Sequence, residues 1–104
     1  MKVTEVTKDN FAAEVLTSDK PVIVDFYADW CGPCRMMRPA LDQLAAERED
    51  IKVASLNVDD EDELAAEYGI SSIPCLIVFK GGSEAKRSVG VIPKAAVLDL
   101  VKNV

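Results

Sequence analysis

Two cysteines three positions apart are the residues of this chain best suited to chemistry. Cys31 and Cys34 enclose Gly32 and Pro33 in the stretch YADWCGPCRMMRP, residues 27–39. A strand pattern gives way to a helical one here, and residues three apart on a helical turn can form a disulfide with little backbone movement. Because a helix N-terminus stabilises a thiolate, Cys31 is the predicted nucleophile. Cys34, one turn further in and more shielded, is the predicted resolving thiol that breaks the mixed disulfide.

Three other uses of the cysteine pair are less favoured. A structural crosslink that closes a loop of about four residues contributes on the order of 2 kcal/mol, against about 3 kcal/mol for a loop of about fifteen. A zinc or iron–sulfur site usually needs four Cys or His ligands, whereas the chain has three Cys and no His, so no metal site is expected. Two unrelated thiols would leave Trp30, Pro33 and the helix start unexplained. Redox chemistry is the preferred interpretation.

Strands and helices alternate around the cysteine pair and must position it. Residues 21–28 are rich in β-branched and aromatic side chains and predict a strand buried on both faces, with Asp25 as its only charge. Apolar residues at helical spacing predict an amphipathic helix over 32–49. The pattern as a whole predicts a mixed central sheet with helices on both faces. The other predicted strands are 2–6, 51–59, 75–80 and 85–91, and the other predicted helices are 11–16, a short one from the acidic cluster 59–63 to Tyr68, and 93–104.

Length and charge limit the kinds of protein this can be. With 104 residues and 49% hydrophobic residues, the chain predicts one globular domain spanning 1–104. Its net charge of −6 argues against nucleic acid or an anionic membrane as the main partner. Residues 1–10 lack the apolar run of a secretory signal, and the run CLIVF is too short to cross a bilayer, so a cytoplasmic location is expected.

Several short segments stand in a characteristic order and spacing: VDFYA at 24–28, WCGPC at 30–34 followed by Pro39, NVD at 57–59, YGISSIP at 68–74, FKGG at 79–82 and VG at 89–90. Over nearly the whole chain they resemble the thioredoxin family. The resemblance implies an α/β thioredoxin fold, with a central mixed sheet of about five strands flanked by about four helices. It also implies a protein dithiol–disulfide oxidoreductase that works in electron transport and cell redox homeostasis. A monomer is expected, although the sequence does not fix the oligomeric state.

The same resemblance implies a set of partners and site residues. The protein would reduce disulfides in target proteins and be recharged by a thioredoxin reductase, with no bound cofactor and with NADPH acting only through the reductase. Asp25 matches the family's buried acid, whose pKa should be raised by burial so that it can exchange a proton with Cys34. Pro74 matches a proline that faces the active site and is usually cis. A shallow apolar groove for an extended substrate segment would be lined by Trp30, Gly32, Pro33, Pro74, Gly90 and the backbone around Ile73.

Four positions depart from the family's common pattern. Cys75 replaces a usual Thr, and its simplest role is a small buried apolar residue, although a disulfide or a soft-metal contact with Cys31 is the sharper alternative. Ser55 replaces a Lys near the buried acid, which predicts a more strongly raised Asp25 pKa than in relatives that have the Lys. Arg35 and Tyr27 replace Lys and Trp, and should keep a positive charge beside Cys34 and an aromatic body in the core.

Two other functions compete with protein-disulfide reduction. In a binding module, the groove around Trp30 and Pro74 would serve as a partner surface and the thiols would be incidental. An oxidant or isomerase would use the same two cysteines, but their disulfide would have a different reduction potential. The Gly-Pro dipeptide between the cysteines and the absence of a signal peptide weigh against the oxidant and isomerase.

Overall fold

A five-stranded mixed sheet forms the centre of the protein, seen here in a computed structural model that describes residues 2–104. The strand order is β1-β3-β2-β4-β5. β3 lies parallel to β1 and β2, whereas β4 is antiparallel to β2 and to β5. The strands are β1 (Thr4–Glu5), β2 (Val22–Tyr27), β3 (Lys52–Asn57), β4 (Cys75–Lys80) and β5 (Ser83–Val89). The mixed α/β sheet expected from the sequence is confirmed.

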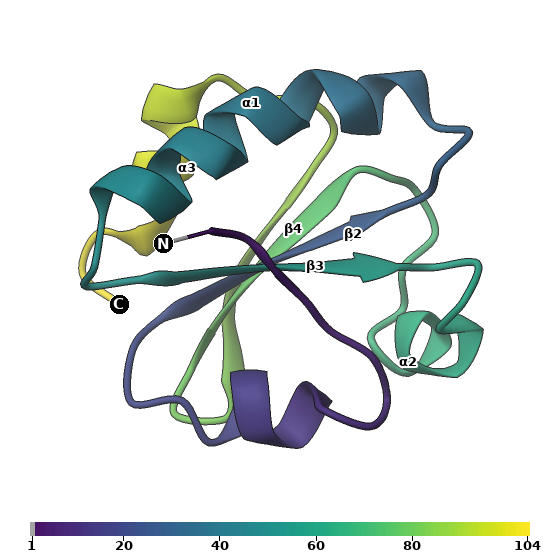
Figure 1. Cartoon of the computed structure of the whole chain (residues 1–104), viewed down its shortest axis with the longest axis horizontal. Helices are drawn as coiled ribbons and strands as arrows, with labels where there is room; N and C mark the ends of the chain where they lie inside the picture. The colour runs from purple at the N-terminus through teal and green to yellow at the C-terminus, as the bar shows by residue number, and fades with distance from the viewer. Residues whose placement is uncertain (1) are drawn as a thin grey trace.

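Helices cover both faces of this sheet. They are η1 (Ala12–Leu16), α1 (Gly32–Glu47), α2 (Asp62–Glu67) and α3 (Lys94–Val101). In Figure 1, α1 and α3 lie above the sheet, while the purple helix η1 and the green helix α2 lie below it. None of the helices within residues 2–104 is both long enough and apolar enough to span a membrane.

Each face of the sheet has its own apolar core. On the α1 side, Met37, Leu41 and Leu44 pack with Ile23 and Val53 of the strands. On the η1 and α2 side, the buried side chains include Phe11, Val15, Phe26 and Phe79. Because β2 contributes side chains to both cores, residues Val22–Phe26 are all buried, which explains their lack of alternation.

Several element boundaries differ from the prediction. β5 begins at Ser83, directly after the glycine turn, and ends at Val89, whereas the sequence predicted 85–91. Gly81 and Gly82 both have positive φ, so the turn is tight and the strand starts earlier. β1 is only two residues long, and η1 is a π-helical segment. The helix predicted over 32–49 ends at Glu47.

Candidate functional site

The cysteine pair lies at the start of α1, shortly after β2 ends. Cys31 is the N-cap of α1, and Pro33 occupies its first turn, where a missing N–H costs nothing. The N–H of Cys34 donates to Sγ of Cys31 at 3.2 Å. The two cysteines form a disulfide with their Cα atoms 5.3 Å apart, as their spacing predicted. The sulfur of Cys31 thus receives a helix N-terminal N–H that would stabilise a thiolate there.

Exposure does not distinguish the two cysteines as the sequence predicted. Cys31 and Cys34 are each 4% exposed, so Cys34 is not the more shielded residue in this disulfide form. Ile73 packs against the pair, and its carbonyl oxygen lies 4.0 Å from Sγ of Cys31. Ile73 therefore covers Cys31 from this side. What distinguishes the two cysteines is their place in the helix, with Cys31 at the cap.

The loop before β4 brings Ile73 to the cysteines and joins the next residue, Pro74, to Gly90. The Ile73–Pro74 peptide bond is cis, as the resemblance implied. The carbonyl of Pro74 accepts a hydrogen bond from the N–H of Gly90 at 2.8 Å. Gly90 has a φ of 96°, a conformation that side chains disfavour. Ile73, Pro74 and Gly90 thus lie together, although they are distant in sequence from Cys31.

Exposed apolar side chains occur around this region. Trp30 is 70% exposed, and its indole N–H donates to Oδ2 of Asp59 at 2.9 Å, which orients the ring at the surface. Met36, Val89 and Val91 are also among the exposed large hydrophobic residues, and none of these three was predicted from the sequence. A signal was available for Met36, because it precedes the inward-facing Met37 by one position and so points away from the core.

Asp25 lies inside the protein, in the middle of β2. It is 1% exposed, and its Oδ1 atom has no hydrogen-bond partner within residues 2–104. Burial raises the pKa of this carboxyl from 3.8 to about 7, while Arg38 acts in the opposite direction and Glu5 adds to the rise. The predicted direction of the shift is confirmed. A carboxyl with a pKa near 7 can both hold and release a proton under ordinary conditions.

Two hydroxyl groups on the strands around Asp25 are bonded to another carboxylate. The Ser55 hydroxyl donates to Oε1 of Glu5 at 3.0 Å. The Tyr27 hydroxyl donates to both carboxylate oxygens of Glu5 at 3.1 Å. Tyr27 is half-buried, not a core aromatic as predicted, because its polar end reaches out to Glu5. Burial and the nearby Glu5 carboxylate raise the pKa of Tyr27 to about 12.

Two further departures from the family pattern have clear positions. Cys75 is a buried free thiol that belongs to the core on the η1 and α2 side of the sheet, and burial raises its pKa. This supports its role as a small apolar residue. Arg35 is exposed and donates to the carbonyl of Asp29 at 2.7 Å, next to the cysteine motif.

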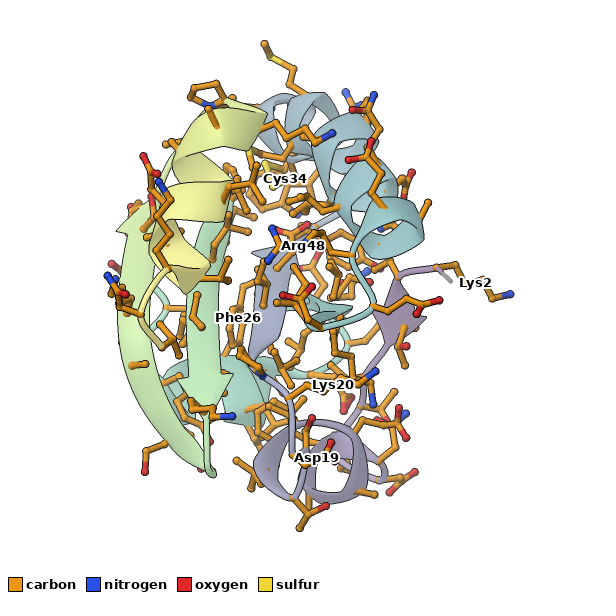
Figure 2. All side chains as sticks on the ribbon, turned by 90° about the vertical axis from the view of Figure 1, so that its left-hand side faces the viewer. Lys2, Asp19, Lys20, Phe26, Cys34 and Arg48 are labelled. Atoms are coloured by element: carbon orange, nitrogen blue, oxygen red, sulfur yellow. A yellow bond between two sulfur atoms is a disulfide. The ribbon has the colours of Figure 1, made fainter. Side chains whose placement is uncertain are left out.

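A cavity lies away from the cysteines. It has a volume of about 550 Å³ and is lined in part by Lys2, Lys20 and Lys52. Figure 2 looks onto this end of the molecule, with Lys2, Asp19 and Lys20 labelled. The cysteine-bearing start of α1 is at the opposite, right-hand end of Figure 1. Within residues 2–104, no group of three or more His, Cys, Asp or Glu side chains is placed to hold a metal ion.

Comparison with known proteins gives a consistent picture. Residues 2–103 match the family described as Thioredoxin. A thioredoxin of Porphyra purpurea is 50% identical over 96 residues, covering 91% of this chain and 90% of the relative. A bifunctional thioredoxin reductase/thioredoxin of Mycobacterium leprae is 50% identical over 104 residues, covering 95% of this chain and 23% of the relative. The solved structure of a mutant thioredoxin from Halobacterium salinarum matches with a TM-score of 0.89 at 35% identity, covering 97% of this chain and 88% of that one. With its cysteine pair closed in a disulfide at a helix start, this chain belongs to the thioredoxin family of thiol–disulfide oxidoreductases.

Proposed function

We propose that this protein reduces disulfides in target proteins through Cys31 and Cys34. The Cys31 thiolate attacks one sulfur of the target disulfide, forms a mixed disulfide and releases the first target thiolate, which takes up a proton. The Cys34 thiolate then attacks Sγ of Cys31 and releases the second target thiolate. The target gains two electrons and two protons, and the Cys31–Cys34 disulfide is formed. The observation that carries this proposal is the N-cap position of Cys31 with the Cys34 N–H on its sulfur.

Asp25 is the proposed proton acceptor for the resolving step. Cys34 must lose its proton before it can attack, and a buried carboxylate is a sufficiently strong base when its pKa is near 7. The unpartnered Oδ1 supports this role, because a carboxyl committed to hydrogen bonds would be a weaker base. Once protonated, Asp25 holds the proton in the interior until the target thiolate leaves.

An extended segment of the target is proposed to dock beside the disulfide. The exposed ring of Trp30 supplies apolar surface next to Cys31, and Gly32 and Pro33 leave the start of α1 without bulky side chains. The Ile73 carbonyl, 4.0 Å from Sγ of Cys31, supports backbone pairing between this loop and the target segment. Gly90 is proposed to border the groove, and its hydrogen bond to the Pro74 carbonyl supports this position. This arrangement favours targets with an accessible, extended chain around the disulfide.

Electrons for the next cycle are proposed to come from a thioredoxin reductase. The Mycobacterium leprae relative, whose name joins a thioredoxin reductase to a thioredoxin, supports this partner. A cytoplasmic location and a monomeric state complete the proposal. The free thiol of Cys75 and a disulfide that must be repeatedly reduced both suit a reducing compartment.

Trapping the mixed disulfide tests this function. Cys34→Ser should accumulate a covalent complex with a disulfide-bonded protein substrate, because the resolving thiol is gone, and mass spectrometry should locate the bond at Cys31. Cys31→Ser should form no such complex. Cys75→Ala is the matched control and should turn over the substrate like the native protein, since its thiol is buried in the opposite core. Equal complex formation by the Cys31→Ser and Cys34→Ser variants would contradict the assignment of the nucleophile.

A further inference from the structure

We propose that Glu5 is a positioning residue that makes the Asp25 carboxylate a stronger base toward Cys34 in the resolving step. It would do so by binding the hydroxyl groups of Ser55 and Tyr27, which adjoin Asp25 in the sheet, and by placing a second negative charge near it. This inference rests on the proton role proposed for Asp25. Glu5 itself contacts neither the cysteines nor the target, so it would act only through Asp25.

The side chains of Glu5, Ser55 and Asp25 form one row across the sheet. Glu5 of β1 is the register partner of Ser55 in β3, and Ser55 is the register partner of Asp25 in β2. Both pairs are parallel, so the three side chains project from the same face, the one covered by α1. Across this row, the Glu5 carboxylate comes first, the Ser55 hydroxyl second and the buried Asp25 carboxyl third. Tyr27 lies two residues after Asp25 on the same strand and shares this face.

The hydroxyl groups of Ser55 and Tyr27 are directed to Glu5. Each hydroxyl has a single proton to donate. The Ser55 proton goes to Oε1 of Glu5 at 3.0 Å, and the Tyr27 proton to the Glu5 carboxylate at 3.1 Å. Oδ1 of Asp25 receives no hydrogen bond within residues 2–104. Because donated hydrogen bonds favour the ionised form of a carboxyl, Glu5 withholds from Asp25 the hydroxyl proton of its register partner Ser55.

Among the charged side chains near Asp25, Glu5 is the one that disfavours the ionised form of Asp25. Arg38 of α1 is the positive group that favours the ionised form of Asp25. Its Nε atom also forms an ion pair with Oδ1 of Asp42 at 3.1 Å. The thiol of Cys75 in β4 also interacts electrostatically with Asp25, and Cys34 of α1 is the group proposed to exchange a proton with it. Glu5 is solvent-exposed at its end of the row, so it does not bear the desolvation cost that Asp25 bears.

Two substitutions at Glu5 separate its charge from its hydrogen bonds. Glu5→Gln removes the charge but keeps an oxygen that can accept from Ser55 and Tyr27. Glu5→Ala removes both and frees the Ser55 hydroxyl to turn toward Asp25. Two strand spacings place the charges about 10 Å apart, so an effective dielectric constant of about 20 with salt screening predicts a fall of roughly half to one pH unit in the Asp25 midpoint for Glu5→Gln. The fall for Glu5→Ala should be larger.

The experiment is a carbon-13 NMR titration of the Asp25 carboxyl in each variant, together with the pH profile of mixed-disulfide breakdown. Glu14→Gln is the matched control, because Glu14 also bonds a residue of β3, Lys52, but at the cavity end of the sheet. It should leave the Asp25 midpoint unchanged. The expected order of midpoints is native and Glu14→Gln highest, then Glu5→Gln, then Glu5→Ala, with the pH profile of breakdown moving in parallel.

Two outcomes would overturn different parts of this proposal. An Asp25 midpoint that is the same in the native protein and both Glu5 variants would refute the role of Glu5, while the trapping experiment with Cys34→Ser could still support disulfide reduction. A midpoint that moves while the pH profile of breakdown stays fixed would refute the proton role of Asp25, and with it the effect of Glu5 on the reaction. Unfolding curves of the exposed Glu5 variants show whether the fold is intact.

Discussion

Replacing Asp25 by asparagine should stabilise the oxidised protein at neutral and alkaline pH. The side chain is 1% exposed, and burial raises its pKa from 3.8 to about 7. Each pH unit between these two values corresponds to about 1.4 kcal/mol, so the ionised carboxylate destabilises the native state by up to about 4 kcal/mol. Asparagine has nearly the same shape and carries no charge at any pH.

The sign and the pH range of this effect follow from the two pKa values. Below pH 3.8, Asp25 is protonated in both the folded and the unfolded chain, so it carries no penalty. Between pH 3.8 and about 7, the unfolded chain loses the proton while the native protein keeps it, and the free energy of unfolding falls as the pH rises. Above about pH 7, the penalty is complete. The stability gained by Asp25→Asn should therefore be small at about pH 4 and full at about pH 8.

Denaturant unfolding of the oxidised native and variant proteins at about pH 4 and about pH 8 measures this difference. Any cost of burying the asparagine amide is independent of pH and cancels when the two pH values are compared. Asp9→Asn is the control, because Asp9 is exposed and should change the free energy of unfolding similarly at both pH values. If the gain from Asp25→Asn is the same at both pH values, burial does not hold the Asp25 proton and the calculated penalty is refuted.

Three further measurements test other parts of the structure. Cys75 should resist alkylation in the native protein and react after denaturation, and labelling at the rate of an exposed thiol would show that it is not buried. Leu41→Ala should lower the free energy of unfolding by about 2–5 kcal/mol, because this fully buried side chain fills the core beneath α1, and a loss under about 1 kcal/mol in denaturant unfolding would contradict that packing. Trp30→Ala should change stability by less than about 0.5 kcal/mol but raise KM for protein targets, and an unchanged KM would argue against Trp30 in the groove.

Local patterns in the sequence were sufficient for the elements near the cysteines. Helical spacing placed Met37, Leu41, Leu44 and Ala45 on one face of a helix, and all four are buried in α1. The β-branched and aromatic residues of 21–28, with Asp25 as their only charge, predicted a buried strand, and β2 lies between β3 and β4. These predictions succeed because amphipathic spacing and strand burial are properties of neighbouring residues.

Boundaries and exposure were harder to predict. Because of the tight glycine turn, β5 begins at Ser83 and not at the predicted residue 85. Tyr27 is half-buried because its hydroxyl donates to Glu5. The hydrophobic residues Met36, Val89 and Val91 lie at the surface, which their residue types alone do not suggest. Such boundaries and exposures depend on which parts of the chain pack against an element, and residue types alone do not predict that packing.

The redox chemistry follows from the sequence alone, because two thiols three residues apart at a helix start need only one helical turn to meet and be activated. The surroundings of that chemistry depend on the tertiary structure. Glu5, Ser55 and Asp25 come from three separate strands, and they form one row because strand order and register bring them together. Register is set by the simultaneous burial of both sheet faces, so the environment of the buried acid follows from the folded sheet and not from any local segment.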